Sequence, residues 1–246
     1  MRDFQTFSCK NAKFRISSPA ANIIIDEIVH QREILDNYIK NNPNFLTSLK
    51  PLEIEKNAPE IVQRMDEASR KTGVGPMAAV AGVFAQISAE KALKTGCKEA
   101  IVENGGDIYI LSRKTVYVGL YPGGGRVSKK LAFRIPADKM PISVCSSSGI
   151  MGHSISFGNC DLATVFSSFS ALGDAAATLA CNLTKKSGDI NRVMEHIMSI
   201  KGIDGILLVI NDKIGIMGEI PELVEQKDPD ISNKITHDNS WETFLK

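Results

Sequence analysis

The spacing of apolar residues along the chain predicts both helices and strands. Between Asp26 and Ile39 the apolar positions lie close to 3.6 residues apart, as on one face of a helix. Residues 77–94 are mostly apolar and rich in alanine, which predicts a helix that packs closely against a sheet. Further helices are expected over residues 60–72, 171–183 and 190–199.

Short apolar runs bounded by turn residues predict the strands. One strand or hairpin is expected over residues 13–25, ending in the run Ile23-Ile24-Ile25. Two runs flank Asn211-Asp212, and this arrangement predicts a hairpin. Other strands are expected over residues 100–103, 108–111, 115–120, 131–135, 142–145 and 161–166, and the strand at 115–120 is expected to pair with the one at 108–111 or to lie near it.

Strands and helices alternate without a strict βαβ repeat. We therefore predict an α+β fold with mixed or antiparallel sheets and with helices packed on one face. A length of 246 residues suits one domain, or two fused α+β halves. We expect residues 1–226 to form that domain and residues 227–246 to form a polar C-terminal tail.

Composition and charge exclude several classes of protein. The formal net charge is +1 and no basic stripe is present, so nothing indicates a nucleic-acid partner. No apolar run approaches the roughly 18 residues of a membrane span, and the first residues lack the apolar segment of a signal peptide. We therefore expect a cytoplasmic protein. The five cysteines and four histidines are scattered, which predicts reduced thiols rather than disulfides or a structural zinc site.

The first candidate site is the turn in the segment ENGGDIYI. Gly105 and Gly106 follow Asn104 and permit positive φ, so backbone amides can approach a ligand there. Asp107 could accept hydrogen bonds from ribose or polyol hydroxyls. The alternative is an ordinary hairpin turn with no ligand.

The second candidate site is the segment VCSSSGIMGHS. Ser146, Ser147, Ser148 and Gly149 follow a strand and could surround an anionic oxygen with O–H and N–H donors, as phosphate-binding nests do. The alternative is a serine-rich surface loop.

Two further residues of this segment could take part in catalysis. His153 could act as a general acid or base near neutral pH, or could simply hydrogen-bond its own loop. Cys145 is expected at the end of a strand, where a neighbouring donor-rich loop could lower its thiol pKa. The alternative is that Cys145 is a small buried hydrophobic residue.

The third candidate site is the segment ALGDAAATLACN. On a helix, Asp174 and Thr178 lie at positions i and i+4, on one face. A carboxylate and a hydroxyl there offer Mg²⁺ two oxygen ligands, with phosphates and waters completing the octahedron. The alternative is that Asp174 stabilises the N-terminus of its helix while Thr178 packs.

Together these segments resemble an uncharacterised family of ApbE-related proteins. The resemblance spans nearly the whole chain and is carried by GVGPMAAVAG, IVENGGDIYI, CSSSGIMGHSISFG and DAAAT. The wider superfamily includes ApbE, an Mg²⁺-dependent transferase that takes FAD, releases AMP and attaches FMN to a Thr or Ser of an acceptor protein. The resemblance implies an ApbE-like α+β fold of two related halves. It also implies a flavin cofactor, FAD or FMN, with Mg²⁺ at Asp174 and Thr178.

The chain departs from the ApbE pattern in two places. The H-x-I-D-P-x-T-G segment has no clear counterpart, and Pro76-Met77 stands where a Lys-Gly pair is expected. Three functions therefore stay open: a flavin transferase, a non-catalytic module that binds a flavin or another phosphorylated ligand for a partner enzyme, and a thiol or persulfide protein of sulfur-amino-acid metabolism that uses Cys145. A homo-oligomer is expected, since sheet edges in such folds often pair.

Overall fold

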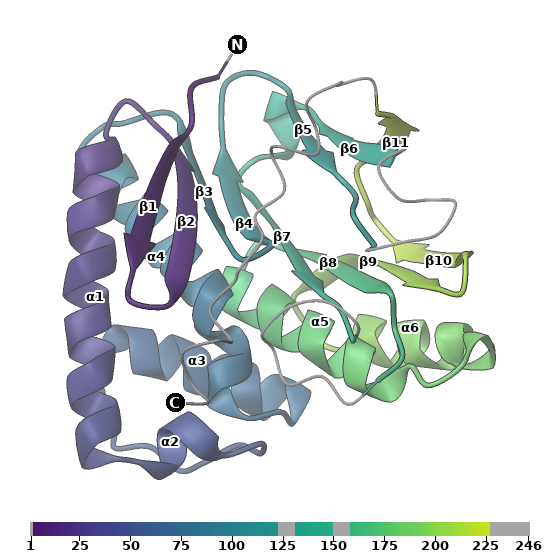
Figure 1. Ribbon diagram of the computed structural model, residues 1–246, viewed down its shortest axis with the longest axis horizontal. Helices are drawn as coiled ribbons and strands as arrows, with labels where there is room; N and C mark the ends of the chain where they lie inside the picture. The colour runs from purple at the N-terminus through teal and green to yellow at the C-terminus, as the bar shows by residue number, and fades with distance from the viewer. Residues whose placement is uncertain (1, 123–130, 150–157, 227–246) are drawn as a thin grey trace.

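The computed structural model describes residues 2–122, 131–149 and 158–226. Its centre is a sheet of eight described strands in the order β1-β2-β3-β4-β7-β8-β9-β10, and every neighbouring pair runs antiparallel (Figure 1). The strands are β1 Gln5–Cys9, β2 Ala12–Ser17, β3 Ala100–Asn104, β4 Asp107–Leu111, β7 Ile142–Ser147, β8 Leu162–Ser167, β9 Ile203–Ile210 and β10 Lys213–Gly218.

Helices cover one face of this sheet, and a small second sheet lies on the other. The helices are α1 Ala21–Asn41, α2 Asn44–Thr47, α3 Glu60–Thr72, α4 Val80–Lys94, α5 Ser170–Leu183 and α6 Ile190–Met198, with short 3₁₀ helices at Pro76–Ala79, Ala137–Lys139 and Ser187–Asp189. The second sheet has the order β11-β6-β5, formed by β11 Glu222–Glu225, β6 Leu131–Ile135 and β5 Val116–Gly119.

The alternation of side chains along the central strands divides the core into two sides. In β3, Ala100 and Val102 pack with the helices, whereas Ile101 packs with the second sheet. In β9, Ile206 faces the helices and Leu207 faces the second sheet. Both faces of the sheet are therefore buried, which explains why these strands read as continuous apolar runs. The predicted α+β fold with helices on one face is confirmed.

Small residues let α4 and α5 approach each other and the sheet. A Cβ on Gly82 would lie 2.3 Å from the Ser170 backbone oxygen, and a Cβ on Gly173 would lie 3.0 Å from the Cys145 Sγ. The two helices therefore need glycine at these positions. This close packing brings the N-terminus of α4 to the first turns of α5.

One predicted element is wrong, and one of the two alternatives for the strand at 115–120 is excluded. The run Ile23-Ile24-Ile25 is helical, because α1 begins at Ala21, five residues earlier than expected. A run of three isoleucines fits a strand or a helix equally well, and here only Ile24 is fully buried. Likewise β5 pairs with β6 in the second sheet, while β4 pairs with β7. The sequence does not show which strands pair across a long connection.

A helix that crosses a membrane needs about 18 or more mostly apolar residues. In the described ranges, no single helix is both long and apolar enough, although the bent pair Glu60–Thr72 and Pro76–Lys94 passes on length and composition taken together. These helices belong to the core that covers the central sheet. The expected tail, residues 227–246, lies outside the described residues.

Candidate functional site

The glycine turn closes the β3–β4 hairpin and directs its carboxylate into the protein. Asn104 and Asp107 are opposite each other across a two-residue turn in which Gly105 and Gly106 have φ of 61° and 106°. The predicted hairpin turn is therefore confirmed, and its geometry explains the need for glycine. Asp107 is only 5% exposed. The Asn104 Nδ2 donates to the Ala81 backbone oxygen at 3.4 Å, which links the turn to α4.

The acidic residue of α5 caps a different helix from its own. Asp174 Oδ2 accepts the Gly82 backbone N–H at 2.8 Å, and the Ala81 N–H also donates to this carboxylate. The N-cap residue of α4, Ala79, makes no side-chain cap, so Asp174 satisfies these N–H groups from the neighbouring helix. The expected alternative, that Asp174 stabilises its own helix N-terminus, is wrong because α5 begins four residues earlier, at Ser170.

Asp107 and Asp174 lie close enough for their charges to interact. Burial raises the pKa of Asp107 well above its ordinary value, the Asp174 charge raises it further, and hydrogen bonds from the Cys145 thiol and the Ser146 N–H lower it only in part. Burial also raises the pKa of Asp174 to about 7, against the opposing effect of its two backbone N–H donors. Among the described residues, Asp107 Oδ1 has no hydrogen-bond partner.

The unpartnered Asp107 Oδ1 raises the question whether the residues around it could hold a magnesium ion. A buried carboxylate pair with an unsatisfied oxygen needs either a proton or a cation. Thr178 follows Asp174 by one helical turn and is itself buried. Within the described ranges no group of three His, Cys, Asp or Glu residues could hold a metal by itself. The residues fit Mg²⁺, which takes few protein ligands and completes its shell with waters and substrate phosphates.

The serine segment begins in β7 and runs past its end. Ser146 Oγ shares a hydrogen bond of 3.0 Å with Thr164 Oγ1, and Ser147 is the last residue of the strand. The Gly149 N–H donates to the Cys160 backbone oxygen at 2.8 Å, so it is engaged within the protein. Phosphate binding by Ser146, Ser147, Ser148 and Gly149 stays a prediction.

Of the two expected catalytic residues, Cys145 and His153, the structure describes only Cys145. Cys145 is fully buried inside β7, not at the end of a strand, and burial followed by the charges of Asp107 and Asp174 raises its thiol pKa well above the ordinary value. These surroundings favour a packing residue over a thiolate. His153 lies outside the described residues.

Sequence reasoning missed the backbone groups that anchor the site. Ala81 and Gly82 donate to Asp174, and Ala81 accepts from Asn104. Their side chains carry no chemistry, so only a glycine inside an alanine-rich helix could have indicated a close approach here. The structure therefore brings together Asn104, Asp107, Cys145 and Asp174 around the start of α4.

Comparison with known proteins shows the family. The family model described as AbpE bacteria matches residues 17–201. A UPF0280 protein of Methanocaldococcus jannaschii is 44% identical over 203 residues, which cover 80% of this chain and 82% of that protein. This chain belongs to the UPF0280 family of ApbE-related proteins. Another UPF0280 protein, from Methanocella arvoryzae, is 36% identical over 233 residues, covering 91% of this chain and 95% of its own.

Solved structures show that the UPF0280 chain has the ApbE-like fold. The flavin transferase ApbE from Vibrio cholerae matches with a TM-score of 0.58 over 89% of this chain and 97% of that chain. The apo form of the Pseudomonas stutzeri flavinyl transferase ApbE matches with a TM-score of 0.59, covering 89% and 94%. Both are 10% identical in sequence, so the likeness concerns the fold alone.

Proposed function

We propose that this UPF0280 protein binds a flavin nucleotide together with Mg²⁺ at the cluster of Asp107 and Asp174. The observation that carries the proposal is the unpartnered Asp107 Oδ1 beside a second buried carboxylate. Two adjacent buried carboxylates are neutralised either by protons or by a counter-cation, and a bound Mg²⁺ would take the place of the protons. The family and the fold support a flavin as the ligand, since the structural neighbours named above are flavin transferases.

In this proposal each residue has a defined task. Asp174 and Thr178 would hold the cation on one face of α5. Asp107, in the β3–β4 hairpin, would balance the positive charge of the cation. Bound Mg²⁺ would neutralise charge on the ligand's diphosphate. The Gly149 N–H binds the Cys160 backbone oxygen. We therefore assign the contacts with the nucleotide to the segment Ser146 to Ser148 and to the Gly105-Gly106 turn.

The finer proposal is transfer of FMN from FAD to an acceptor protein. The acceptor's hydroxyl oxygen would bond to the flavin-side phosphorus as the P–O bond to AMP breaks, and the hydroxyl proton would pass to His153. A non-catalytic module that binds the flavin for a partner enzyme would use the same cluster and release no AMP. Release of AMP therefore distinguishes the transferase from the non-catalytic module.

The experiment measures FAD affinity by fluorescence titration with and without Mg²⁺, and AMP release by chromatography. We expect Mg²⁺ to strengthen FAD binding, and Asp107→Asn and Asp174→Asn to remove that gain. Asp138→Asn is the matched control, because Asp138 is an exposed carboxylate of the 3₁₀ helix Ala137–Lys139 and is not part of the cluster. Unchanged FAD affinity in both cluster variants would contradict the proposal. FAD binding without release of AMP would exclude the transferase and support the non-catalytic flavin-binding module.

A thiol or persulfide protein that uses Cys145 is the alternative function that the sequence left open. The burial and raised thiol pKa of Cys145 disfavour it. It would be supported only if Cys145 in the folded protein reacted with iodoacetamide faster than a free thiol does.

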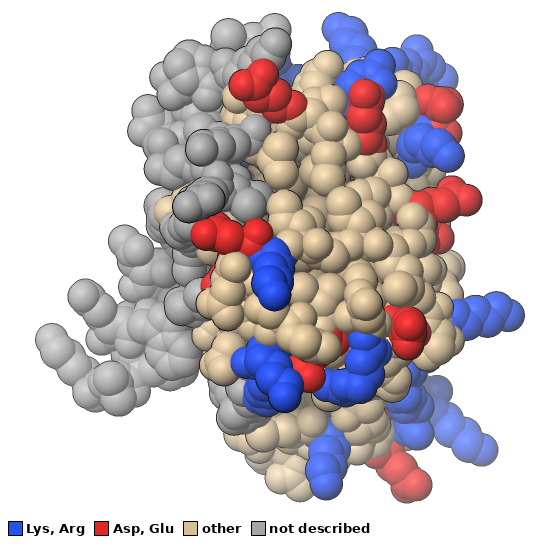
Figure 2. All heavy atoms as spheres, turned by 90° about the vertical axis from the view of Figure 1, so that its right-hand side faces the viewer, with Lys and Arg blue, Asp and Glu red and all other residues tan. Residues whose placement is uncertain are grey.

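A homo-oligomer and a cytoplasmic location also belong to this proposal. β10 is an edge strand of the central sheet and exposes Ile214 and Ile216, two residues apart on one side of the strand. The face of the molecule near β10 is mostly uncharged in its middle (Figure 2). An antiparallel β10–β10 contact between two copies would cover this edge. Light scattering of the wild type and of Ile216→Lys tests it, with a monomer expected for the variant.

A further inference from the structure

A cavity of about 540 Å³ lies at the opposite end of β3 and β4 from the glycine turn. It is formed by the end of β2, the start of α1, the residue before β3 and the connection after β4. Its size is within the range of small-molecule sites. The lining residues are Arg2, Asp3, Ser17, Ser18, Pro19, Glu99, Lys114 and Thr115.

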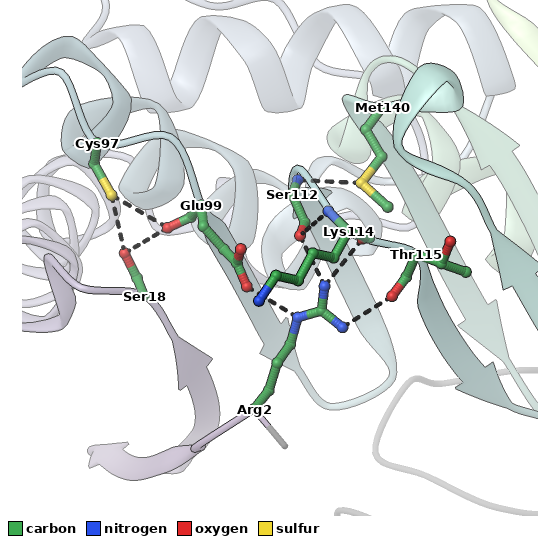
Figure 3. A network of polar contacts seen from close by, with 8 residues as sticks. All are labelled: Arg2, Ser18, Cys97, Glu99, Ser112, Lys114, Thr115 and Met140. Atoms are coloured by element: carbon green, nitrogen blue, oxygen red, sulfur yellow. Dashed lines mark hydrogen bonds and ion pairs between the residues drawn. The ribbon is translucent and has the colours of Figure 1, made fainter.

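Arg2 holds the walls of this cavity together (Figure 3). Its guanidinium donates to Glu99 Oε1 at 2.9 Å and to Ser112 Oγ at 2.8 Å. It also donates to the backbone oxygens of Lys114 and Thr115, each at 3.0 Å. The connection between β4 and β5 is thus fixed to the first residues of the chain. Since Arg2 uses its donors in this way, its role is to shape the site rather than to bind a ligand.

Ser18 fixes the opposite wall in the same manner. Its Oγ donates to the Glu99 backbone oxygen at 2.8 Å (Figure 3). The same Oγ accepts the Ala20 N–H at 3.1 Å. These contacts hold the start of α1 beside the cavity. α1 has no side-chain cap from its N-cap residue and no acidic residue in its first turn. The positive end of the helix dipole at this wall therefore lacks a negative side chain of its own.

Two lining groups are free to bind a ligand. Ser17 is 6% exposed and lines the cavity, yet in the described part of the chain its hydroxyl has no hydrogen-bond partner. Lys114 is an exposed cation on the fixed connection, and none of the described residues forms an ion pair with it. A hydroxyl that lines a cavity can pair there with water or with a ligand.

The charges around the cavity limit what can bind. Glu99 is neutralised by Arg2, and the remaining carboxylate, Asp3, is exposed. The charges that are not paired within the cavity are therefore the cation of Lys114 and the anion of Asp3. One cation can bind one negative group of a ligand, whereas Asp3 would repel a polyanion such as a nucleoside triphosphate. Cys97 lies beside Ser18, with 3.4 Å between its Sγ and the Ser18 Oγ. Burial alone would raise its thiol pKa, but hydrogen bonds with Ser18 and with nearby backbone groups lower it below the ordinary value.

We propose that this cavity binds a small metabolite through a single carboxylate or phosphate group, with Lys114 and Ser17 as the binding residues and Thr115 beside them. The site is separate from the Asp107–Asp174 cluster and does not depend on the flavin proposal. Binding is therefore expected to persist in Asp107→Asn, which distinguishes failure of one proposal from failure of the other.

The test uses acetate and inorganic phosphate as probes, titrated at constant ionic strength and followed by ¹H–¹⁵N NMR at the Ser17, Ser18 and Thr115 amides. We expect saturable shifts with one of the two probes, which identifies the preferred anion. Lys114→Gln is expected to weaken binding about tenfold, the range for a hydrogen bond to a charged group. Ser17→Ala is expected to weaken it less, and Asp3→Asn to strengthen it.

Arg113→Gln is the matched control, because Arg113 is an exposed cation next to Lys114 that does not line the cavity. Its affinity is expected to equal that of the wild type. Equal losses in Arg113→Gln and Lys114→Gln would show unspecific attraction and overturn the proposal. So would linear shifts with both probes, or an unchanged affinity in Lys114→Gln whose amide spectrum shows a folded protein.

Discussion

Asp174 on α5 accepts the backbone N–H of Gly82 on α4 at 2.8 Å, so a side chain of one helix caps the start of the other. The reverse contact also exists, since the Ser170 N–H at the start of α5 donates to Gln86 Oε1 of α4 at 2.7 Å. Each helix therefore supplies an acceptor for the first turn of its neighbour. This reciprocal capping fixes α5, and with it Asp174 and Thr178, relative to the glycine turn.

Removing the cap is expected to destabilise the fold. Asp174→Ala leaves the Gly82 and Ala81 N–H groups without an acceptor and should lower the free energy of unfolding by about 1–2 kcal/mol. Asp174→Asn keeps an acceptor oxygen and should cost less. Urea denaturation at pH 6 measures both. Equal stability of Asp174→Ala and the wild type would show that the cap contributes nothing.

The stability of the metal-free protein is expected to fall as pH rises. The ordinary pKa of an aspartate is 3.8, and in the folded protein that of Asp174 is about 7. Between about pH 4 and pH 7 the folded state therefore binds more protons than the unfolded state, so the free energy of unfolding decreases through this window. Denaturation in EDTA at several pH values measures this slope.

Asp174→Asn carries no titrating group at this position and is expected to show a smaller slope over the same pH window. Mg²⁺ competes with the proton for the carboxylates, so its stabilising effect should grow with pH. An effect of Mg²⁺ that is the same at pH 5 and pH 8 would speak against a cation at Asp174.

Gly82 is expected to tolerate no side chain. An added Cβ would lie 2.3 Å from the Ser170 backbone oxygen and 2.9 Å from the Asp174 Cβ, so α4 and α5 would have to separate. Gly82→Ala should therefore lower stability by about 1–3 kcal/mol or more. Gly188→Ala, where a Cβ meets no atom within 4 Å, is the control and should stay near the wild type. Thermal denaturation of both variants provides the comparison.

The thiols are expected to differ in reactivity. Cys97 is partly exposed and has a lowered pKa, whereas Cys145 is fully buried and has a raised one. Because the rate of alkylation follows the thiolate fraction, iodoacetamide at pH 7.5 should alkylate Cys97 at least about tenfold faster than Cys145. Peptide mapping of the folded protein at several times measures both rates. Faster labelling of Cys145 would revive the thiol function.

The sequence alone determined the local elements and the family. Hydrophobic periodicity was sufficient for α3, α5, α6 and the β9–β10 hairpin, because these depend on contacts between residues close in the chain. The motifs around Asp107, Ser147 and Asp174 indicated the family because they occur together and in this order, whereas each motif alone is a weak signal. The turn at Gly105-Gly106 was readable because only positive φ explains two adjacent glycines there.

Only the tertiary structure decided which groups meet. That β5 joins a second sheet, that Asp174 caps α4 rather than α5, and that Cys145 is buried near the charges of Asp107 and Asp174 all depend on contacts across many residues of chain. Such contacts are set by the packing of whole layers, and backbone donors such as the Gly82 N–H leave no mark in the residue types. The cavity beside Lys114 arises in the same way, from segments that are about 97 to 113 residues apart in sequence.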